Sequence, residues 1–343
     1  MSEHTQTTAP AHVQTPRQAT MTAAVITAPQ TLEFVEQPRP EPGPGEVRVR
    51  IRGCGVCASN LPVWAGREWF DYPQPAGAPG HEAWGVVEAL GANVRDVAVG
   101  DPVALLSQHA YATHDVAPVA DLLPLPPRLA DVAFPAEPLA CAVNAFARCA
   151  IEPGQTVAIV GIGFLGALLT QLVTNAGGRV IAVSRRAYAR RVAESCGAQT
   201  TVAFDDGQQA VTEIMALTAG EGCPRVIEAT GAEVALNFAA EICAVRGRLI
   251  VAGYHQGQRC VNMQQWNWRG LDVINAHERD PERYRSGMRT ALDAVTTGRL
   301  NPTPLITHRL PLFRLAEAFR LLRVRPDGFL KAVVIPPQLE DEP

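Results

Sequence analysis

Short apolar runs alternate with segments of helical spacing through the middle of the chain. Thr156–Val160 is a β-branched and apolar run, a glycine-rich turn follows it, and Phe164–Asn175 then has the spacing of a helix. Further apolar runs indicate four more strands, at Val180–Val183, Arg225–Ala229, Arg248–Ala252 and Asp272–Asn275. Helix-like segments lie between or after them, at Tyr188–Cys196, Ala210–Leu217, Val234–Ala244 and Glu282–Thr297. This alternation predicts a parallel sheet covered by helices on both faces.

The two flanks of this region have a different pattern. Residues 21 to about 135 are dense in Gly and Pro and show little helical periodicity, which indicates a β-rich, barrel-like domain. The last stretch, from about Asn301, contains one helix-like segment, Leu312–Leu322, and one strand-like run, Leu330–Ile335. We expect this stretch to rejoin the first domain. Residues 1–20 are rich in Thr, Gln, Ala and Pro, and we expect a disordered tail there rather than a signal peptide.

Length and composition then narrow the class of protein. The chain has 343 residues, which favours two domains, and its 47% hydrophobic and 19% charged residues can build sizeable cores. The net charge of -4 argues against a nucleic-acid partner. The most membrane-like stretch, Val157–Val173, is shorter than the roughly 20 apolar residues of a spanning helix, so we expect no membrane segment. Eight cysteines do not form the dense framework of a small secreted domain, which favours a reducing, cytoplasmic setting.

The glycine-rich turn has the sequence of a dinucleotide-binding fingerprint. It consists of Gly161-Ile162-Gly163-Phe164-Leu165-Gly166, and it lies between a predicted strand and a predicted helix. Gly161 permits the tight turn, Gly163 lets the backbone approach a pyrophosphate, and Gly166 lets helix and strand pack closely. A glycine-rich turn without a ligand is the alternative, but the alternating strands and helices favour cofactor binding.

The end of the second predicted strand bears on which nicotinamide cofactor is bound. An NAD site has an acidic residue at this position, about 20 residues after the glycine fingerprint, which binds the ribose hydroxyls. This chain instead has Ser184, followed by Arg185 and Arg186, with Arg190 and Arg191 one turn later. Guanidinium groups can bind a 2′-phosphate through paired hydrogen bonds. A solvated basic helix face has the same composition, but the missing acid favours NADP over NAD.

Two short motifs in the first predicted domain contain metal-binding residue types. They are Cys57-Ala58-Ser59-Asn60 and Gly80-His81-Glu82, with about 24 residues between Cys57 and His81, so that folding alone could bring them together. A thiolate, an imidazole and a carboxylate are the ligand set of a catalytic zinc, which keeps one position open for substrate. Glu137-Pro138-Leu139-Ala140-Cys141 adds a further carboxylate and thiol.

Together these motifs resemble the zinc-type medium-chain dehydrogenase/reductase family, the alcohol and polyol dehydrogenases. The resemblance extends from about Met21 to Ile335. Besides the glycine fingerprint it rests on Gly53-Cys54-Gly55-Val56-Cys57-Ala58-Ser59-Asn60, Pro79-Gly80-His81-Glu82-Ala83-Trp84-Gly85, Val99-Gly100-Asp101 and Glu137-Pro138-Leu139. It implies an α/β fold, with a doubly wound parallel Rossmann sheet and a β-rich GroES-like catalytic domain. The Rossmann domain would span 144–299 and the catalytic domain 21–143 and 300–343.

The resemblance also implies roles for the motif residues at the metal. Cys57 and His81 would be ligands of one catalytic zinc ion, and Glu82 would be a resting-state ligand or lie just behind the metal. Glu137 occupies the third-ligand position of the polyol-dehydrogenase branch, so that either Glu82 or Glu137 could complete the set. Ser59 matches the hydroxyl that passes the alcohol proton toward solvent.

The resemblance implies further partners. Thr230 would contact the nicotinamide, and Gly253 would belong to the cofactor-binding residues. The substrate would be a small alcohol or carbonyl compound, and the chain would assemble as a homodimer or homotetramer. Trp64, Trp69, Phe70 and Trp84 flank the ligand motifs, where walls of a substrate pocket and ordinary core packing are equally good interpretations.

Three departures from the family pattern affect the metal site. Asn60 stands where the family usually has Asp, and it can accept a hydrogen bond from the ligand histidine without bringing a charge. No histidine follows Asn60 directly, so a proton path must end elsewhere. The lobe of four closely spaced cysteines that holds a structural zinc in many relatives is missing after Asp101, which predicts one zinc at most. Cys54 and Cys57 form a C-x-x-C pair, but no βαβ context favours a redox dithiol.

The expected activity is therefore reversible transfer of a hydride between a nicotinamide cofactor and an alcohol or carbonyl substrate, with a polyol, cyclitol or sugar favoured by the context of Glu137. Two alternatives remain open. One is a zinc-free quinone or enone reductase of the same fold, and the other is a non-catalytic NADPH-binding protein. The presence of Cys57, His81 and Glu82 in the ligand positions argues against both.

Overall fold

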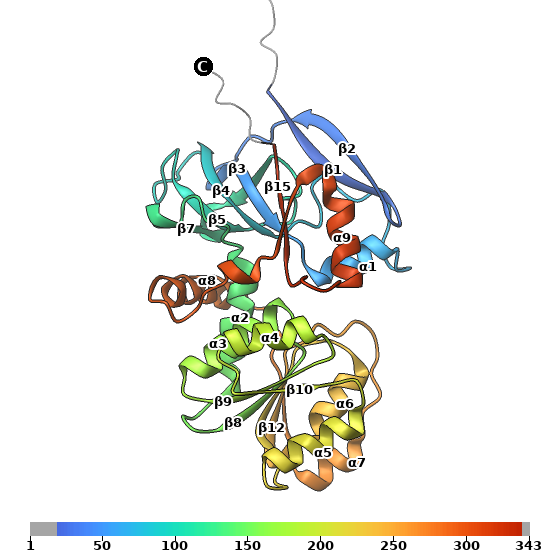
Figure 1. Cartoon of the computed structure of the whole chain (residues 1–343). Coiled ribbons are helices and arrows are strands. Elements are labelled where there is room, and N and C mark those ends of the chain that lie inside the picture. The colour runs from blue at the N-terminus through green and yellow to red at the C-terminus, as the bar shows by residue number, and fades with distance from the viewer. Residues whose placement is uncertain (1–18, 338–343) are drawn as a thin grey trace, which may run out of the picture.

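The computed structural model describes residues 19–337. In it, the alternating middle region forms a six-stranded parallel sheet (Figure 1). The strand order is β10-β9-β8-β11-β12-β13. The strands are β8 (Thr156–Val160), β9 (Arg179–Ser184), β10 (Thr200–Ala203), β11 (Cys223–Glu228), β12 (Cys243–Val251) and β13 (Asp272–Asn275). This is the Rossmann order, in which the direction of winding reverses between β8 and β11, and ligands bind beyond the carboxyl ends of those strands.

Helices cover both faces of this sheet, as the sequence pattern predicts. They are α3 (Phe164–Asn175), α4 (Ala187–Ser195), α5 (Gly207–Leu217), α6 (Glu233–Glu241), α7 (Met263–Arg269) and α8 (Pro281–Thr296). Apolar residues of α3, α4 and α8 pack on one face, and apolar residues of α5 and α6 pack on the other. We call these strands and helices the Rossmann lobe.

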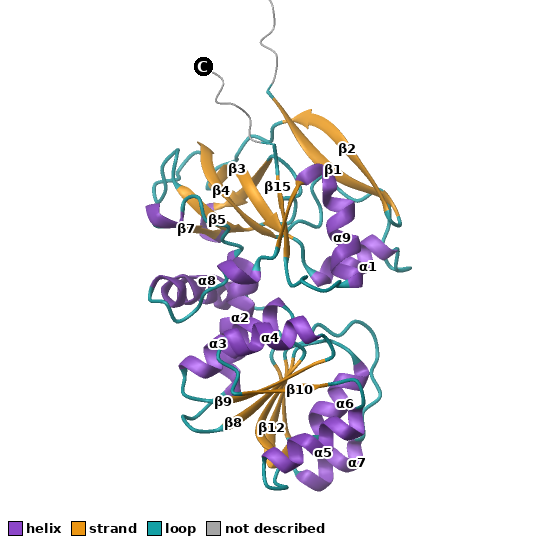
Figure 2. Ribbon diagram, in the orientation of Figure 1, coloured by secondary structure: helices purple, strands orange, loops and turns teal. Residues whose placement is uncertain are grey.

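The flanks of the chain form a second, β-rich lobe around a seven-stranded sheet (Figure 2). Its strands follow the order β14-β15-β3-β4-β5-β7, and β6 pairs with β3. They are β3 (Glu46–Gly55), β4 (Glu82–Leu90), β5 (Pro102–Leu106), β6 (His114–Pro118), β7 (Leu122–Pro124), β14 (His308–Pro311) and β15 (Ala332–Ile335). A hairpin of β1 (Thr20–Ala28) and β2 (Thr31–Pro38) and the helices α1 (Leu61–Ala65) and α9 (Leu315–Val324) complete the lobe.

The stretch that ends with β15 returns to the β-rich lobe, because β15 pairs antiparallel with β3. The helix α2 (Ala136–Cys149) connects the two lobes, and the boundary predicted at 143/144 falls inside it. One core cluster continues through this helix from Trp84 of β4 to Ile227 of β11. The lobes therefore meet through packed side chains rather than through a bare linker.

The bounds of β8, α3 and β13 agree with the predicted ranges, whereas β10, α7 and β14 were not predicted. The first 18 residues of the predicted tail lie outside the described part of the chain, and Thr20 already belongs to β1. Between residues 19 and 337, no helix is both long enough and apolar enough to cross a membrane.

Candidate active site

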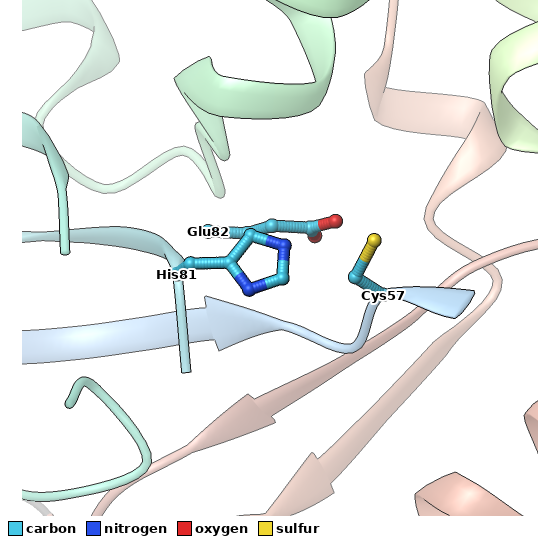
Figure 3. Close-up of side chains that lie close together, drawn as sticks. All are labelled: Cys57, His81 and Glu82. Carbon is cyan, nitrogen blue, oxygen red and sulfur yellow. The ribbon is translucent and has the colours of Figure 1, made fainter. Parts of the chain in front are cut away.

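Three of the four predicted metal ligands, Cys57, His81 and Glu82, come together where β3 ends and β4 begins. Cys57 lies two residues after β3, and His81 immediately precedes Glu82, the first residue of β4. The two strands are antiparallel, with Gly55 opposite Glu82. One ligand atom from each side chain lies within 4.8 Å of the other two (Figure 3). A Cβ added at Gly55 would lie 1.8 Å from Glu82 Oε2, so any larger residue there would displace the carboxylate from this position.

The imidazole of His81 is oriented by a backbone carbonyl. His81 Nδ1 donates to the carbonyl oxygen of Pro79 over 2.9 Å, which leaves Nε2 as the nitrogen available to a metal. Asn60 Nδ2 donates to the same carbonyl over 3.2 Å, and its Oδ1 accepts a hydrogen bond of 2.7 Å from the buried Tyr111 hydroxyl. The sequence led us to expect that Asn60 accepts a hydrogen bond from His81, but His81 Nδ1 donates to the Pro79 carbonyl and Asn60 Oδ1 accepts from Tyr111 instead. Asn60 fixes the loop that carries the accepting carbonyl.

The carboxylate of Glu82 is paired with a buried lysine that the sequence analysis did not single out. Lys331 Nζ lies 2.6 Å from Glu82 Oε1 and 2.5 Å from Oε2, but only the Oε1 contact has hydrogen-bond geometry. The ammonium also donates to the carbonyl oxygen of Val56 over 3.2 Å and lies 5.2 Å from the ring centre of Phe164. Burial alone would lower the pKa of Lys331, but the charge of Glu82 keeps it above its ordinary value.

A signal for Lys331 was present in the sequence. It is the only lysine of the chain, whose other strongly basic residues are all arginine, and it is 4% exposed. Lysine is almost never buried unless it is paired, so a single lysine in an apolar run indicates a buried carboxylate partner. Its compact ammonium fits between a carbonyl, a carboxylate and an aromatic ring, where a planar guanidinium needs a wider space.

The charges of the cluster fit a divalent cation. Burial by itself would lower the pKa of His81, but the hydrogen bond and charge of Cys57, with the charges of Glu137 and Glu82, raise it to about 10. The cluster thus attracts positive charge, and Glu82 Oε2 receives no hydrogen bond from a described residue. A sulfur, an imidazole nitrogen and a carboxylate oxygen at these separations suit zinc with a fourth position open.

The second candidate carboxylate, Glu137, lies in the first turn of α2 and outside this trio. The Cys141 thiol donates to Glu137 Oε1 over 3.3 Å, and the Tyr284 hydroxyl of α8 lies 3.5 Å from Cys141 Sγ. Burial raises the pKa of Glu137, while the charge of His81 lowers it in part. Of the two acids that the sequence left open, Glu82 belongs to the donor trio, whereas Glu137 lies outside it and acts on His81 through its charge.

The aromatic residues near the ligand motifs divide between the core and the surface. Trp64 is 2% exposed and stacks on Phe319 with ring centres 5.0 Å apart, and Trp84 is also buried. Trp69 is 55% exposed. Core packing is therefore the better interpretation for Trp64 and Trp84.

The glycines of the fingerprint occupy three different environments. Gly161 has φ +100°, which L-residues rarely adopt, and a Cβ there would lie 2.3 Å from Thr230 Cγ2. A Cβ at Gly166 would lie 2.1 Å from the Gly161 carbonyl oxygen, so α3 packs closely on the turn. A Cβ at Gly163 would meet no described atom within 4 Å. Gly163 is the N-cap of α3, which has no side-chain cap, so the first N–H groups of this helix are available to an anion such as a pyrophosphate. Phe164 and Leu165 form the first turn of α3.

Thr230 and Gly253 lie at the carboxyl ends of β11 and β12. The Thr230 hydroxyl donates to Glu228 over 2.5 Å, and His255 Nε2 lies 2.8 Å from the other oxygen of the same buried carboxylate. A Cβ at Gly253 would lie 2.2 Å from the Gly231 nitrogen. Glu228 thus holds both strand ends in place beside the glycine turn, and Thr230 shapes that turn.

The basic residues after β9 have different surroundings. Ser184 is buried and its Oγ accepts a hydrogen bond of 3.3 Å from the Arg186 backbone nitrogen. Arg190 donates to the carbonyl oxygens of Ser184 and Arg185. The side chain of Arg185 is exposed, whereas the guanidinium of Arg186 donates to two main-chain carbonyls.

Two family models match the chain in the regions of these two sites. The model described as "Alcohol dehydrogenase GroES-like domain" matches residues 43–120, and the one described as "Zinc-binding dehydrogenase" matches residues 165–293, together more than half of the chain. The chain belongs to the zinc-binding medium-chain dehydrogenase family. This dehydrogenase is a zinc-dependent enzyme of the alcohol and polyol dehydrogenase type, and its two lobes are the GroES-like catalytic domain and the Rossmann domain.

Known relatives resemble the dehydrogenase over most of their length. It is 23% identical to L-galactonate-5-dehydrogenase of Escherichia coli, over 92% of this chain and 99% of the relative. It is 27% identical to human sorbitol dehydrogenase, over 78% of this chain and 83% of the relative. Among solved structures, it matches a zinc-binding dehydrogenase of Sinorhizobium meliloti bound to NADP, with a TM-score of 0.80, 25% identity and coverage of 93% of this chain and all of the other.

Proposed function

We propose that this dehydrogenase uses NADP to interconvert a polyol, cyclitol or sugar with its carbonyl counterpart. The observation that carries the proposal is the donor trio of Cys57, His81 and Glu82, connected through Lys331 to Phe164 at the start of the cofactor-binding helix. A metal site and a cofactor turn that share a contact residue can place a substrate hydroxyl beside a nicotinamide.

The residues of the chain divide the chemical work. Zinc held by Cys57, His81 and Glu82 would supply a Lewis acid for the substrate oxygen. Ser59 places its hydroxyl 3.5 Å from His81 Nε2, where it can take the proton that the substrate hydroxyl loses while it passes its own proton on toward solvent. The glycine turn orients the cofactor, and the chemistry of hydride transfer belongs to the nicotinamide itself.

The preference for a polyhydroxylated substrate rests on Glu137 and on the relatives. The carboxylate of Glu137 acts on His81 through its charge, and it stands in the Glu-Pro-Leu context that resembles the polyol-dehydrogenase branch. Two relatives named for a sugar acid and a sugar alcohol, L-galactonate-5-dehydrogenase and sorbitol dehydrogenase, cover most of the chain. Turnover of a panel of sugars, cyclitols, aromatic aldehydes and aliphatic ketones tests this choice, and activity confined to the last two classes would refute it.

Replacing Ser59 by alanine tests the proton path. We expect Ser59→Ala to lower kcat about a hundredfold, because general acid–base groups typically contribute that much, while zinc content stays unchanged. Ser59→Thr keeps a hydroxyl at the same position and should retain most of the activity. Steady-state kinetics across pH measures both variants, and a Ser59→Ala enzyme with wild-type kcat at every pH would exclude this role.

Replacing Ser184 by aspartate tests the choice of cofactor. The new carboxylate, at the buried end of β9, would repel a 2′-phosphate and accept hydrogen bonds from ribose hydroxyls. We expect the ratio of kcat/KM for NADPH over NADH to fall at least about a hundredfold, since like charges placed together cost several kcal/mol. Ser195→Asp, which adds the same charge at the exposed end of α4, is the matched control. A wild-type enzyme that prefers NADH would refute the NADP assignment.

A further inference from the structure

A loop of the catalytic domain lies against the end of β9. The guanidinium of Arg186 donates to the Phe329 carbonyl oxygen over 2.5 Å and to the Ile162 carbonyl oxygen over 3.1 Å. Arg191 of α4 lies 4.0 Å from Asp327. Phe329 and Asp327 belong to the loop between α9 and β15, and Figure 1 shows this end of α9 facing the Rossmann domain. Residues of the catalytic domain therefore reach the place where a Rossmann fold binds the adenosine ribose.

The guanidinium of Arg186 is engaged in the contact between the two domains. Both of its terminal nitrogens donate to main-chain carbonyls, one in each domain. Its neighbour Arg185 is exposed, and its guanidinium has no hydrogen bond or ion pair with any residue between 19 and 337. Arg185 is thus the arginine of the Ser184–Arg186 motif that is free to bind an anion.

A second available guanidinium comes from the catalytic domain. Arg325 caps the C-terminus of α9 with φ +51°, and its Nε donates to the Leu322 carbonyl oxygen over 3.3 Å. Its two terminal nitrogens have no partner within the described residues. Desolvation, followed by the positive charge of Arg185, lowers the pKa of Arg325. Desolvation also lowers the pKa of Arg186, and the charge of Arg325 adds to this shift.

These groups form a concentration of positive charge. Asp327 faces it from the catalytic domain: it lies 4.0 Å from Arg191, and its charge opposes the lowering of the pKa of Arg186. The first turn of α4 has no side-chain cap, so its N–H groups also favour an anion nearby. Guanidinium groups on two sides can each form paired hydrogen bonds with phosphate oxygens.

We propose that Arg185 of the Rossmann domain and Arg325 of the catalytic domain together bind the 2′-phosphate of NADP. The phosphate is then held by residues of both domains, with Ser184 at the base of the site and Arg186 keeping the two loops in contact. This inference rests on the NADP preference proposed above, and it adds a cofactor-binding residue outside the Rossmann domain.

The test compares ligands that differ by one phosphate. Calorimetry on the full-length enzyme measures binding of 2′,5′-ADP and of 5′-AMP at fixed ionic strength, and kinetics measures kcat/KM for NADPH and NADH. Arg325→Gln should weaken 2′,5′-ADP binding at least about tenfold and leave 5′-AMP binding and NADH turnover unchanged. Arg325→Lys should recover part of the loss. Arg323→Gln, an exposed arginine of the same helix that contacts Gln30, should behave as wild type.

The outcomes distinguish the role of Arg325 from the NADP preference on which it rests. A wild-type enzyme that binds 2′,5′-ADP no more tightly than 5′-AMP would overturn both the NADP preference and the role of Arg325. A wild-type preference for 2′,5′-ADP that persists within about twofold in Arg325→Gln would overturn the role of Arg325 alone. A loss of both ligands in Arg325→Gln would show a general structural effect and would equally contradict a specific phosphate contact.

Discussion

Replacing Cys57 by serine should remove the zinc and lower kcat/KM about a thousandfold or more. The thiol is one of three donor atoms that lie within 4.8 Å of one another, and a serine hydroxyl is a much weaker ligand for zinc. A Lewis acid stabilises the developing charge on the substrate oxygen by several kcal/mol, which corresponds to this loss of rate. Metal analysis and steady-state kinetics measure the two effects on the same preparation.

The matched control makes the same change at another cysteine. Cys260 is exposed, and its side chain lies outside the donor trio. Cys260→Ser should therefore keep both the zinc and the activity of the wild type. A Cys57→Ser enzyme with full activity would contradict the metal-dependent mechanism, and a loss of zinc in Cys260→Ser would place a ligand where the structure has none.

Replacing Lys331 by methionine should destabilise the metal-free protein by about 3–5 kcal/mol, because the fully buried Glu82 carboxylate would lose its cation. The thermal midpoint should fall by about 10 °C, the scale expected for a domain of this size. Adding Glu82→Gln to Lys331→Met should recover much of the loss, since removing both charges leaves no unpaired ion. Differential scanning calorimetry after zinc removal measures all three proteins.

A small effect of Lys331→Met would contradict the buried pair. If the midpoint of Lys331→Met equals that of the wild type, the contacts of Lys331 with Glu82 and Val56 do not stabilise the fold. Lys331→Arg keeps the charge, but its planar, larger head has to fit beside the ring of Phe164. We expect this variant to fall between the wild type and Lys331→Met.

The fold was predictable where local pattern and packing agree. The apolar run of β8 and the helical spacing of α3 are both buried in the Rossmann core, and their predicted bounds agree with the structure. The strand β10 has four residues, of which one is buried, so its hydrophobic pattern is too weak to detect. The helix α7 has no buried residue, so its sequence lacks the periodic apolar positions from which a helix is predicted.

The candidate site was predictable only in part. Cys57, His81 and Glu82 stand in short motifs with a recognisable ligand set, and β3 and β4 place them side by side. Lys331 lies 249 positions from Glu82, and no local pattern connects the two. The main-chain carbonyl of Pro79 orients His81. Because every residue has such a carbonyl, the sequence does not indicate which one makes this contact.

The arginines after β9 show the same limit. Their position in the Rossmann pattern indicated an anion site, but the sequence could not tell which of them would be engaged by the other domain. Arg186 turns to Phe329, 143 positions away, and Arg185 stays exposed. The difference arises from how the two domains pack together, which appears in the folded chain and not in the motif.

Titration of zinc into the metal-free enzyme, with NADPH-dependent turnover followed at each step, tests the central claim most directly. Turnover should be absent without metal, rise in proportion to bound zinc and level off at about one ion per chain, the occupancy of a single three-ligand catalytic site. Full turnover in enzyme from which all metal has been removed would contradict the assignment of Cys57, His81 and Glu82 as the catalytic metal site.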